Sequence, residues 1–339
     1  MQTYAPHNVL ITGGAGFIGC HFVRYLLGVD AHVRIANLDV LTYAGSLDNL
    51  KALPDPDRHD VVPGTICDQT LVVDLLRRYD IDTIVHFAAE SHVDRSITGP
   101  AAFIQTNVVG TFTLLEAARD FWLNIKGWDD TRCRFYHIST DEVYGSLGMH
   151  DAPFCERTPY APNSPYAASK AASDHLVRAY HETYGLPTVT SHCSNNYGPY
   201  QHDEKFIPTV MRSCLRGEPI PVYGDGSNRR DWLYVEDHCT AIDRVMRRGR
   251  VGETYNIGGG QDWKNLDVVH LICQVLADLT GRPVEPYTRL IHFVTDRPGH
   301  DWRYAISSTK LQNELHWAPV ESLETGLRKT AAWYLEKYA

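Results

Sequence analysis

A glycine-rich segment directly after the first apolar run is the feature that most restricts the fold of this chain. Residues 8–12 read Asn-Val-Leu-Ile-Thr, which is typical of a buried strand, and residues 17–27 have the pattern of a helix. Between them lie Gly13, Gly16 and Gly19 in a GxxGxxG spacing. Such glycines permit a tight strand-to-helix turn whose backbone N–H groups can approach a pyrophosphate at the helix N-terminus. The segment therefore predicts a dinucleotide-binding βα unit.

Asp39 specifies the dinucleotide further. It ends a second predicted strand, residues 33–38, about twenty residues after Gly19. A carboxylate at this place accepts hydrogen bonds from the adenosine ribose, and its charge disfavours a 2′-phosphate. The pattern thus favours NAD over NADP as the cofactor. The alternative is an ordinary glycine turn beside a solvated aspartate.

Strand-like and helix-like segments alternate through the first half of the chain. The further predicted strands are residues 83–87, 135–138 and 186–193, and the further helices are residues 100–122 and 164–184. This alternation predicts an α/β fold, with a doubly wound parallel sheet of the Rossmann type.

The pattern changes after Asn195. Short strands and glycine turns separate helices over residues 236–248 and 265–280. We expect residues 1–194 to form the NAD-binding domain and residues 195–339 to form a smaller α/β domain. The boundary is soft, and some crossing of the chain between the domains is expected.

Composition excludes several classes of protein. Of the 339 residues, 43% are hydrophobic and 22% are charged, as in soluble globular proteins. The net charge of −9 argues against nucleic-acid and anionic-membrane partners. No apolar run approaches the roughly 18 residues of a membrane span. The eight cysteines form no CxxC and no signal peptide precedes them, which favours reduced thiols in the cytoplasm. The 17 histidines lack the spacing of a metal site, so no metal is expected.

Tyr166 and Lys170 form the first catalytic candidate. They lie one helical turn apart, so both side chains face the same way. A tyrosine is a poor base at its ordinary pKa of about 10. We expect the Lys170 ammonium and an oxidised nicotinamide to lower the pKa of Tyr166, so that it can take a proton from a hydroxyl group. Thr140, at the end of a predicted strand, could bond the same oxygen.

Asp141 and Glu142 follow Thr140 at the carboxyl end of the strand, where open α/β sheets bind ligands. Two adjacent carboxyls can divide acid and base roles if their environments separate their pKa values. Asp and Glu also suit the first turn of a helix, as capping residues. From the residues alone, both interpretations stay open.

Several motifs together resemble the dTDP-glucose 4,6-dehydratases, which are extended short-chain dehydrogenases/reductases. The matching segments extend over nearly the whole chain: residues 13–19, 87–94, 139–145, 166–170, 195–200, 230–238 and 296–301. The segment Ser-Thr-Asp-Glu-Val-Tyr-Gly at 139–145 is the most specific, because related epimerases lack its Asp-Glu pair. The resemblance implies that residues 195–339 bind a nucleotide sugar.

The resemblance also implies a reaction. Tyr166, assisted by Lys170 and Thr140, would take the O4 proton of the hexose while NAD accepts hydride from C4. Glu142 would then remove the C5 proton, and Asp141 would protonate the departing C6 hydroxyl. Return of hydride to C6 and reprotonation of C5 would give dTDP-4-keto-6-deoxy-D-glucose, with one water released.

Binding roles follow from the same matches. The residues expected at NAD are Gly13, Gly16, Phe17, Ile18, Gly19, Asp39, Thr42, Thr65, Ile66, Ala88, Thr106, Tyr166, Lys170 and Asn196. Those expected at the nucleotide sugar are Ser91, Thr140, Asn195, Lys205, Phe206, Pro221, Tyr223, Arg230, Asn265, Asp296 and His300. Arg230 is expected to bind the diphosphate, since a guanidinium can bond phosphate oxygens in pairs. The family pairs subunits through helices that match residues 100–122 and 164–184, so a homodimer is expected.

The sequence departs from the family pattern at some positions, and other functions share parts of that pattern. Thr65 stands where the family usually has Asp, and Phe206 replaces an aliphatic residue, which bears on affinity more than on the reaction. A UDP-hexose 4,6-dehydratase would use the same chemistry. A 4-epimerase or decarboxylase would share the cofactor site but would not need an acid at C6. A non-catalytic NAD-sensing scaffold would be expected to lose Tyr166 or Lys170.

Overall fold

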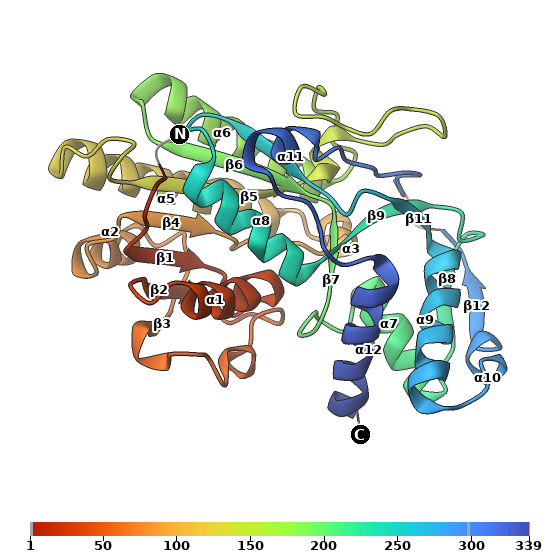
Figure 1. The fold of residues 1–339 in the computed structure, drawn as a ribbon. Helices are drawn as coiled ribbons and strands as arrows, with labels where there is room; N and C mark the ends of the chain where they lie inside the picture. The colour runs from red at the N-terminus through yellow and green to blue at the C-terminus, as the bar shows by residue number, and fades with distance from the viewer. Residues whose placement is uncertain (1–2, 297–298, 339) are drawn as a thin grey trace.

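The computed structural model describes residues 3–296 and 299–338, so Arg297 and Pro298 of the 296–301 motif lie outside the described residues. A seven-stranded sheet with the order β10-β6-β5-β4-β1-β2-β3 forms its larger part (Figure 1). All neighbouring pairs in this sheet are parallel. The strands are β1 (Asn8–Thr12), β2 (Arg34–Asp39), β3 (His59–Pro63), β4 (Thr83–His86), β5 (Arg134–Thr140), β6 (Thr188–Cys193) and β10 (Thr254–Ile257).

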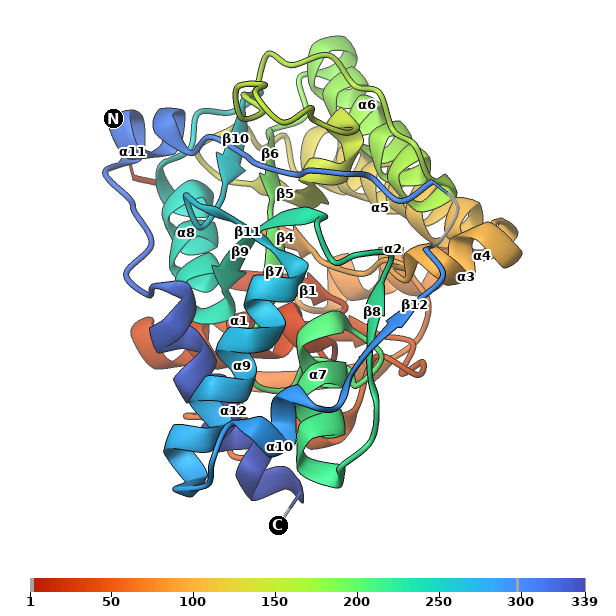
Figure 2. The same ribbon diagram turned by 90° about the vertical axis from the view of Figure 1, so that its right-hand side faces the viewer.

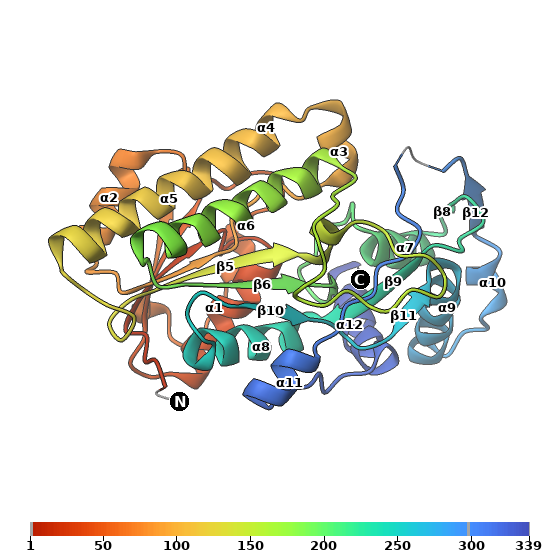
Figure 3. The same cartoon turned by 90° about the horizontal axis from the view of Figure 1, so that it is seen from above.

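Helices cover both faces of this sheet. Figure 3 shows α2, α5 and α6 along one face and α1 and α8 along the other. The helices of this part are α1 (Phe17–Val29), α2 (Gln69–Arg78), α3 (Val93–Thr98), α4 (Ala101–Phe103), α5 (Thr111–Ala118), α6 (Pro165–Tyr184), α8 (Val235–Arg248) and α11 (Thr309–Leu315). Successive residues of a strand point to opposite faces. Val9 and Ile11 therefore pack in the core beneath α1 and α8, while Leu10 packs beneath α2 and α5.

The second part of the chain has its own core. Helices α7, α9 and α12 lie together beside β8 and β12 (Figure 2). A three-stranded sheet, β11-β9-β7, connects this part to the larger sheet. The elements are β7 (Asn195–Tyr197), α7 (Phe206–Arg216), β8 (Ile220–Tyr223), β9 (Arg229–Tyr234), β11 (Asp262–Lys264), α9 (Asn265–Thr280), α10 (Glu285–Thr288), β12 (Ile291–Val294) and α12 (Leu323–Tyr338).

The chain returns to the larger sheet after it has entered the second part. Strand β10 pairs with β6, and α8 packs on the same face as α1. These segments come from residues 235–257. The domain boundary at residue 194 stays a prediction. The return of β10 to the larger sheet is one example of the expected crossing of the chain between the two parts.

The sequence analysis predicted β1, β2, β4, β5, β6 and the helices α1, α6, α8 and α9, but it assigned no ranges to β3, α2, α7, α11 and α12. Strand β3 was not predicted, because its residues His-Asp-Val-Val-Pro lie at the sheet edge and are only partly buried, so no apolar run marks them. The helix expected over 100–122 runs from Ala101 to Ile125 and contains π-helical segments at Ile104–Gly110 and Arg119–Ile125.

Asn107 accounts for the first π-helical segment. Its carbonyl oxygen accepts the hydroxyls of Thr111 and Ser173, each at 2.6 Å. Side chains that insert into the backbone ladder in this way widen a helix locally. The amide nitrogen of Asn107 donates to the Ser169 hydroxyl on α6 at 2.8 Å, so the wide turn also fixes α6.

Among the described residues, no helix combines the length and the apolar character needed to cross a membrane.

We expect Gly13→Ala to lower the free energy of unfolding. Gly13 has a φ of +75°, and an added Cβ would lie 2.7 Å from the backbone nitrogen of Ala88. The left-handed backbone costs about 1–2 kcal/mol and the overpacking about 1–3 kcal/mol more. Gly217→Ala is the matched control, because Gly217 has a φ of +67° and no described atom lies within 4 Å of an added Cβ. Equal losses for the two variants in urea unfolding would contradict the close-approach argument.

Candidate active site

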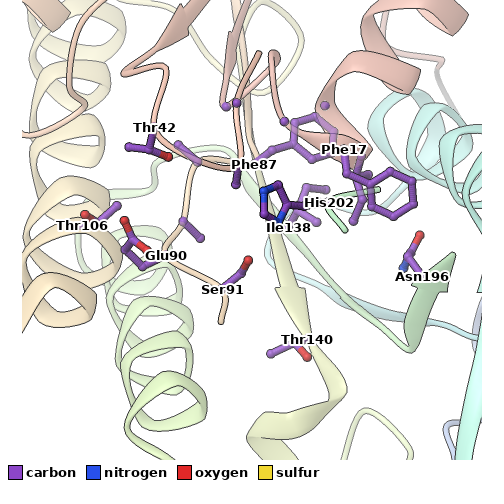
Figure 4. A pocket seen from close by; sticks show the side chains of 18 of the residues that line it. Phe17, Thr42, Phe87, Glu90, Ser91, Thr106, Ile138, Thr140, Asn196 and His202 are labelled. Carbon is purple, nitrogen blue, oxygen red and sulfur yellow. The ribbon is translucent and has the colours of Figure 1, made fainter. Parts of the chain in front are cut away.

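A cavity of about 430 Å³ opens at the carboxyl edge of the larger sheet. The residues at the ends of β1, β2, β4, β5 and β6 line it. Figure 4 shows Thr42, Glu90 and Thr106 on one side of the cavity and Phe17 and Asn196 on the other. This edge is where open α/β sheets bind ligands, at the point where the strand order reverses between β1 and β4.

The cavity gathers the residues that the sequence analysis assigned to NAD. All of them line it: Gly13, Gly16, Phe17, Ile18, Gly19, Asp39, Thr42, Thr65, Ile66, Ala88, Thr106, Tyr166, Lys170 and Asn196. Thr65, the departure from the family pattern, uses its hydroxyl to accept the backbone N–H of Cys67 at 3.2 Å.

The turn between β1 and α1 is built to accept an anion. Gly16 is the N-cap residue of α1, and no side chain caps the helix there. The first N–H groups of a helix have no partner within the helix, so this end presents donors and a positive dipole to the cavity. A Cβ on Gly19 would lie 2.2 Å from the carbonyl oxygen of Gly13, so only glycine permits this close packing.

Asp39 is held at the end of β2 by backbone donors. Its Oδ2 accepts the Ala15 N–H at 2.9 Å and its Oδ1 accepts the Leu41 N–H at 2.8 Å. An ionised carboxylate can accept about four hydrogen bonds in total, so both oxygens keep capacity for hydroxyl donors. Asp39 is buried and lines the cavity, and its alternative interpretation as a solvated aspartate is therefore wrong.

Thr140, Asp141 and Glu142 lie at the end of β5, where a short 3₁₀ turn, Asp141–Tyr144, begins. Thr140 is the N-cap residue of this turn, and its Oγ1 accepts the Glu142 N–H at 3.3 Å. Asp141 and Glu142 therefore lie in the first turn, but the N-cap residue is Thr140 and not an acid. Both carboxyls also line the cavity.

Asp141 has the surroundings of an acid that keeps its proton. It is buried, and its Oδ2 has no hydrogen-bond partner among the described residues. Burial raises the pKa of the Asp141 carboxyl well above its ordinary value, and the carboxyls of Glu142 and Asp231 add to the rise. The Arg230 guanidinium acts in the opposite direction. The two adjacent acids thus differ in environment, as separate acid and base roles require.

Tyr166 and Lys170 are brought to the cavity by α6. Ser164 caps this helix by accepting the Ala167 N–H at 3.0 Å, and Pro165 occupies its first turn. Both functional side chains are buried, and the Lys170 Nζ donates to the carbonyl oxygen of Ile138 at 2.8 Å.

The expected lowering of the Tyr166 pKa, by Lys170 together with an oxidised nicotinamide, stays a prediction. Burial raises the pKa of this phenol well above its ordinary value, and the carboxyl of Glu142 adds to the rise. A hydrogen bond with the Thr140 side chain opposes it. Helical spacing alone could not reveal the burial or the neighbouring carboxyl, because both come from packing against β5.

The residues assigned to the nucleotide sugar fall into two groups. Ser91, Thr140, Asn195 and Lys205 line the cavity. Phe206, Pro221, Tyr223, Arg230, Asn265, Asp296 and His300 are not among its lining residues. Phe206 stacks on Trp232 with ring centroids 5.9 Å apart, as a core residue does.

Arg230 is a buried residue of β9, beyond the lining of the cavity. Its guanidinium donates to the backbone carbonyls of Arg229 at 2.7 Å and Asp301 at 2.8 Å, and it lies 4.3 Å from the centre of the Tyr304 ring. The carboxyl of Glu142 adds to the rise that burial causes in the Tyr304 pKa. Arg230 therefore lies on the side of the molecule to which Asp141 and Glu142 face.

Three of the remaining residues form a group beside β8 and β12. Tyr223 ends β8, and its ring lies 6.0 Å from that of His300. The Nδ1 of His300 is 2.6 Å from a carboxylate oxygen of Asp296. Pro221 is exposed on the same strand. Asn265 begins α9, and its buried Oδ1 has no partner among the described residues.

Sequence reasoning missed other residues that line the cavity, among them Glu90, Cys193, Ser194, Gln201, His202 and Glu204. Glu90 belongs to a quoted motif, so a signal for it existed. His202 and Glu204 lie in the connection between β7 and α7, and no pattern in that connection marks them.

The parallel sheet, the uncapped glycine turn and the Tyr–Lys pair define a dinucleotide-binding short-chain dehydrogenase/reductase. A family model described as GDP-mannose 4,6 dehydratase matches residues 10–330. A dTDP-glucose 4,6-dehydratase of Xanthomonas campestris is 57% identical over 96% of this chain and 92% of its own length. The chain therefore belongs to the dTDP-glucose 4,6-dehydratase family, within the wider group that this model describes.

Solved structures agree with this. A dTDP-glucose 4,6-dehydratase of Streptomyces venezuelae, solved with NAD bound, is 46% identical and has a TM-score of 0.87, with 97% of each chain covered. A UDP-glucose 4-epimerase of Thermotoga maritima is only 27% identical, although its TM-score is 0.85 over 98% of this chain and 100% of its own. The fold is thus shared with epimerases, while the sequence is nearer to the dehydratases.

We expect Asp141→Asn to raise the free energy of unfolding by about 1–3 kcal/mol at pH 8, because it removes a buried carboxyl that must hold its proton above its ordinary pKa when the chain folds. The pKa of Asp141 is raised on folding. Its contribution to stability is therefore complete below the unfolded pKa and is lost as the pH rises towards the folded pKa. The advantage of the variant should grow between pH 5.5 and pH 8 in urea unfolding. Asp57→Asn, at an exposed carboxyl, controls for the change in net charge. A pH-independent difference would contradict the assignment.

Proposed function

We propose that this protein is an NAD-dependent dTDP-glucose 4,6-dehydratase, a carbon–oxygen lyase that converts dTDP-D-glucose to dTDP-4-keto-6-deoxy-D-glucose and water. The observation that carries the proposal is that the pair Asp141 and Glu142 lines the same cavity as Tyr166 and Lys170. The 57% identity to a relative of this name supports the same reaction.

The residues of the cavity fit NAD. The uncapped N-terminus of α1 suits the pyrophosphate, and the spare capacity of the Asp39 oxygens suits the ribose hydroxyls. The negative charge of Asp39 would repel a 2′-phosphate, which favours NAD over NADP. The chemistry that NAD supplies when bound is a reversible hydride transfer, used first at C4 of the hexose and then at C6.

Tyr166 is the base for the hydroxyl at C4. The rise in its pKa means that the phenol keeps its proton in the described protein. The Lys170 ammonium and the cationic nicotinamide together would favour the phenolate. The hydroxyl of Thr140 would bond the same oxygen of the hexose and keep it within reach of Tyr166.

Elimination then needs an acid and a base on neighbouring carbons. Once C4 is a ketone, the C5 hydrogen is acidic, and Glu142 removes it. Asp141 gives its proton to the C6 hydroxyl, which leaves as water. The raised pKa of Asp141 supports this division, because a carboxyl that keeps its proton near neutral pH can act as a general acid.

The nucleotide lies towards the second part of the chain. We assign NAD to residues 1–194 and the nucleotide sugar to residues 195–339, with Ser91 and Thr140 reaching the sugar from the first part. Arg230 is the residue proposed for the diphosphate. Its backbone contacts hold the guanidinium in place, and fixed donors suit bidentate bonding to phosphate oxygens. Phe206 contributes through Trp232, which it supports, rather than by a polar contact.

Incubation with dTDP-glucose and no added reductant tests the proposal. We expect a product lighter by one water, and deuterium placed at C4 should appear at C6 of the same molecule. A product of unchanged mass would indicate a 4-epimerase. Faster turnover of UDP-glucose than of dTDP-glucose would indicate the UDP-hexose dehydratase.

Glu142→Gln is the matched variant for this experiment. It keeps the shape of the side chain and removes the base, so loss of water should fall by about 100-fold or more. Exchange of the C5 hydrogen with solvent should fall with it. Normal turnover by Glu142→Gln would overturn the role proposed for this residue.

We also propose a homodimer that forms through the helices over residues 100–122 and 164–184. Ile104, Val109 and Phe112 support it, since these large apolar side chains of the first helix are 49%, 38% and 46% exposed. A contiguous apolar surface on a helix favours a protein partner.

A cytoplasmic location stays a prediction. All eight cysteines lie in the described part of the chain as free thiols, which is typical of a reducing compartment.

Phe112→Asp should therefore convert a dimer to a monomer, because it places a charge in the apolar interface. Sedimentation velocity measures the change. Val29→Asp is the control, because Val29 is 57% exposed on α1, outside the two helices. A wild-type protein that sediments as a monomer would overturn the proposed dimer.

A further inference from the structure

A buried polar cluster lies behind the active site and is centred on Asp174. His137 Nε2 lies 3.0 Å from Oδ1 of this carboxylate, and Oδ2 accepts hydrogen bonds from Ser139 Oγ at 3.0 Å and Tyr160 at 3.1 Å. His192 Nε2 lies 3.0 Å from Oδ2. A carboxylate only accepts hydrogen bonds, so both imidazoles present an N–H to it. None of these contacts has a part in the reaction steps above.

Asp174 lies one helical turn beyond Lys170 on α6, so the two side chains face the same side of the helix. Both are buried, with 5% and 4% of their surface exposed. A buried charge without an opposite charge is strongly unfavourable. The Lys170 ammonium donates to the neutral carbonyl oxygen of Ile138. Asp174 is therefore the anion that can balance Lys170 within this interior.

The cluster also links the two elements that carry the catalytic side chains. Ser139 on β5 immediately precedes Thr140, and it is bonded to Asp174 on α6. Tyr144 ends the turn that carries Asp141 and Glu142, and its hydroxyl lies 2.7 Å from His192 Nδ1. A shift of α6 against β5 would break these contacts.

We propose that Asp174 is a positioning residue for the dehydratase reaction: it is the buried counter-charge that keeps Lys170 in the ammonium form beside Tyr166, and it fixes α6 against the strand that carries Thr140. The catalytic part of this statement rests on the proposed function. The proposed electrostatic effect of Asp174 on Lys170 does not rest on it, because that effect can be measured in the folded protein without the reaction.

The pKa shifts of Asp174, Lys170 and His137 agree with the contacts of this cluster. Burial opposes ionisation of Asp174, but the hydrogen bonds from His137 and His192 outweigh it and hold the pKa of this carboxyl well below its ordinary value. Burial lowers the pKa of Lys170, and the charge of Asp174 acts against this fall. The pKa of His137 is lowered to about 4, chiefly by burial and then by Lys170, so this ring is neutral near pH 7.

Other titratable groups face this pair from the elements around it. Tyr160 comes from the connection before α6, Cys193 from β6, and His86 from β4, where the charge of Lys170 adds to the lowering that burial causes in the His86 pKa. Tyr144 and His192 complete the set. Imidazoles are ordinarily neutral above pH 8. Between pH 8 and pH 10, Lys170 is therefore the cation to follow.

The chain has eight lysines, so ¹³Cε-lysine NMR of the NAD-loaded protein can follow Lys170 directly, assigned by its loss in Lys170→Met. In the wild type we expect the ammonium form at pH 8. In Asp174→Asn the midpoint should fall by about one pH unit or more. Tyr160→Phe is the matched control, because it removes one donor and keeps the charge, and its midpoint should stay within about 0.3 pH units of the wild type.

Activity gives the second readout. The alkaline limb of the kcat profile should move to lower pH in Asp174→Asn, with KM nearly unchanged, and Asp174→Glu should restore it. An unchanged Lys170 midpoint in Asp174→Asn, or a loss of kcat that is equal at every pH, would overturn the proposal. A neutral Lys170 at pH 8 in the wild-type protein would also overturn the proposal, and this measurement does not depend on the folding of any variant. The NMR titration of Lys170 does not depend on dehydration activity. It therefore distinguishes failure of this proposal from failure of the proposed function.

Discussion

The parallel hydrogen-bond ladder of the seven-stranded sheet is the constraint on which the site depends. Because every strand runs in the same direction, the carboxyl ends of β1, β2, β4, β5 and β6 meet at one edge. Residues far apart in the chain therefore share one cavity there. Helices on both faces bury the sheet and make it rigid, so the side chains at its edge are held by a packed core rather than by loops alone.

In this cavity and directly behind it, burial decides which side chains ionise. It favours the protonated form of Asp141 and the neutral phenol of Tyr166, and the ionised Asp174 escapes this effect because hydrogen bonds surround it. The proposed catalytic acid Asp141 and the buried anion Asp174 are thus the same chemical group in two environments. An enzyme that needs an acid and a base on neighbouring atoms must separate them in this way, and it gives up some stability to do so.

The motifs predicted much of the site because each is read from local spacing. The glycine turn, Asp39 at a strand end, and Tyr166 one turn before Lys170 all follow from the periodicity of strands and helices. Strand β3 and the π-helical turn at Asn107 could not be predicted, since an edge strand is weakly apolar and the turn depends on a hydroxyl from Ser173 on α6. His202 and Glu204 line the cavity from a connection with no regular pattern.

The sequence by itself determined the alternation of strands and helices in the first half of the chain, the dinucleotide turn and the candidates for the reacting side chains, because these patterns depend on neighbours a few residues apart. Only the tertiary structure decided how those side chains ionise and which of them meet. The rise in the Tyr166 pKa arises from burial and from Glu142 on another element. The grouping of Asp174 with His137 and His192 joins residues 37 and 18 positions away. Desolvation and long-range contact are properties of packing, and no spacing in the chain encodes them.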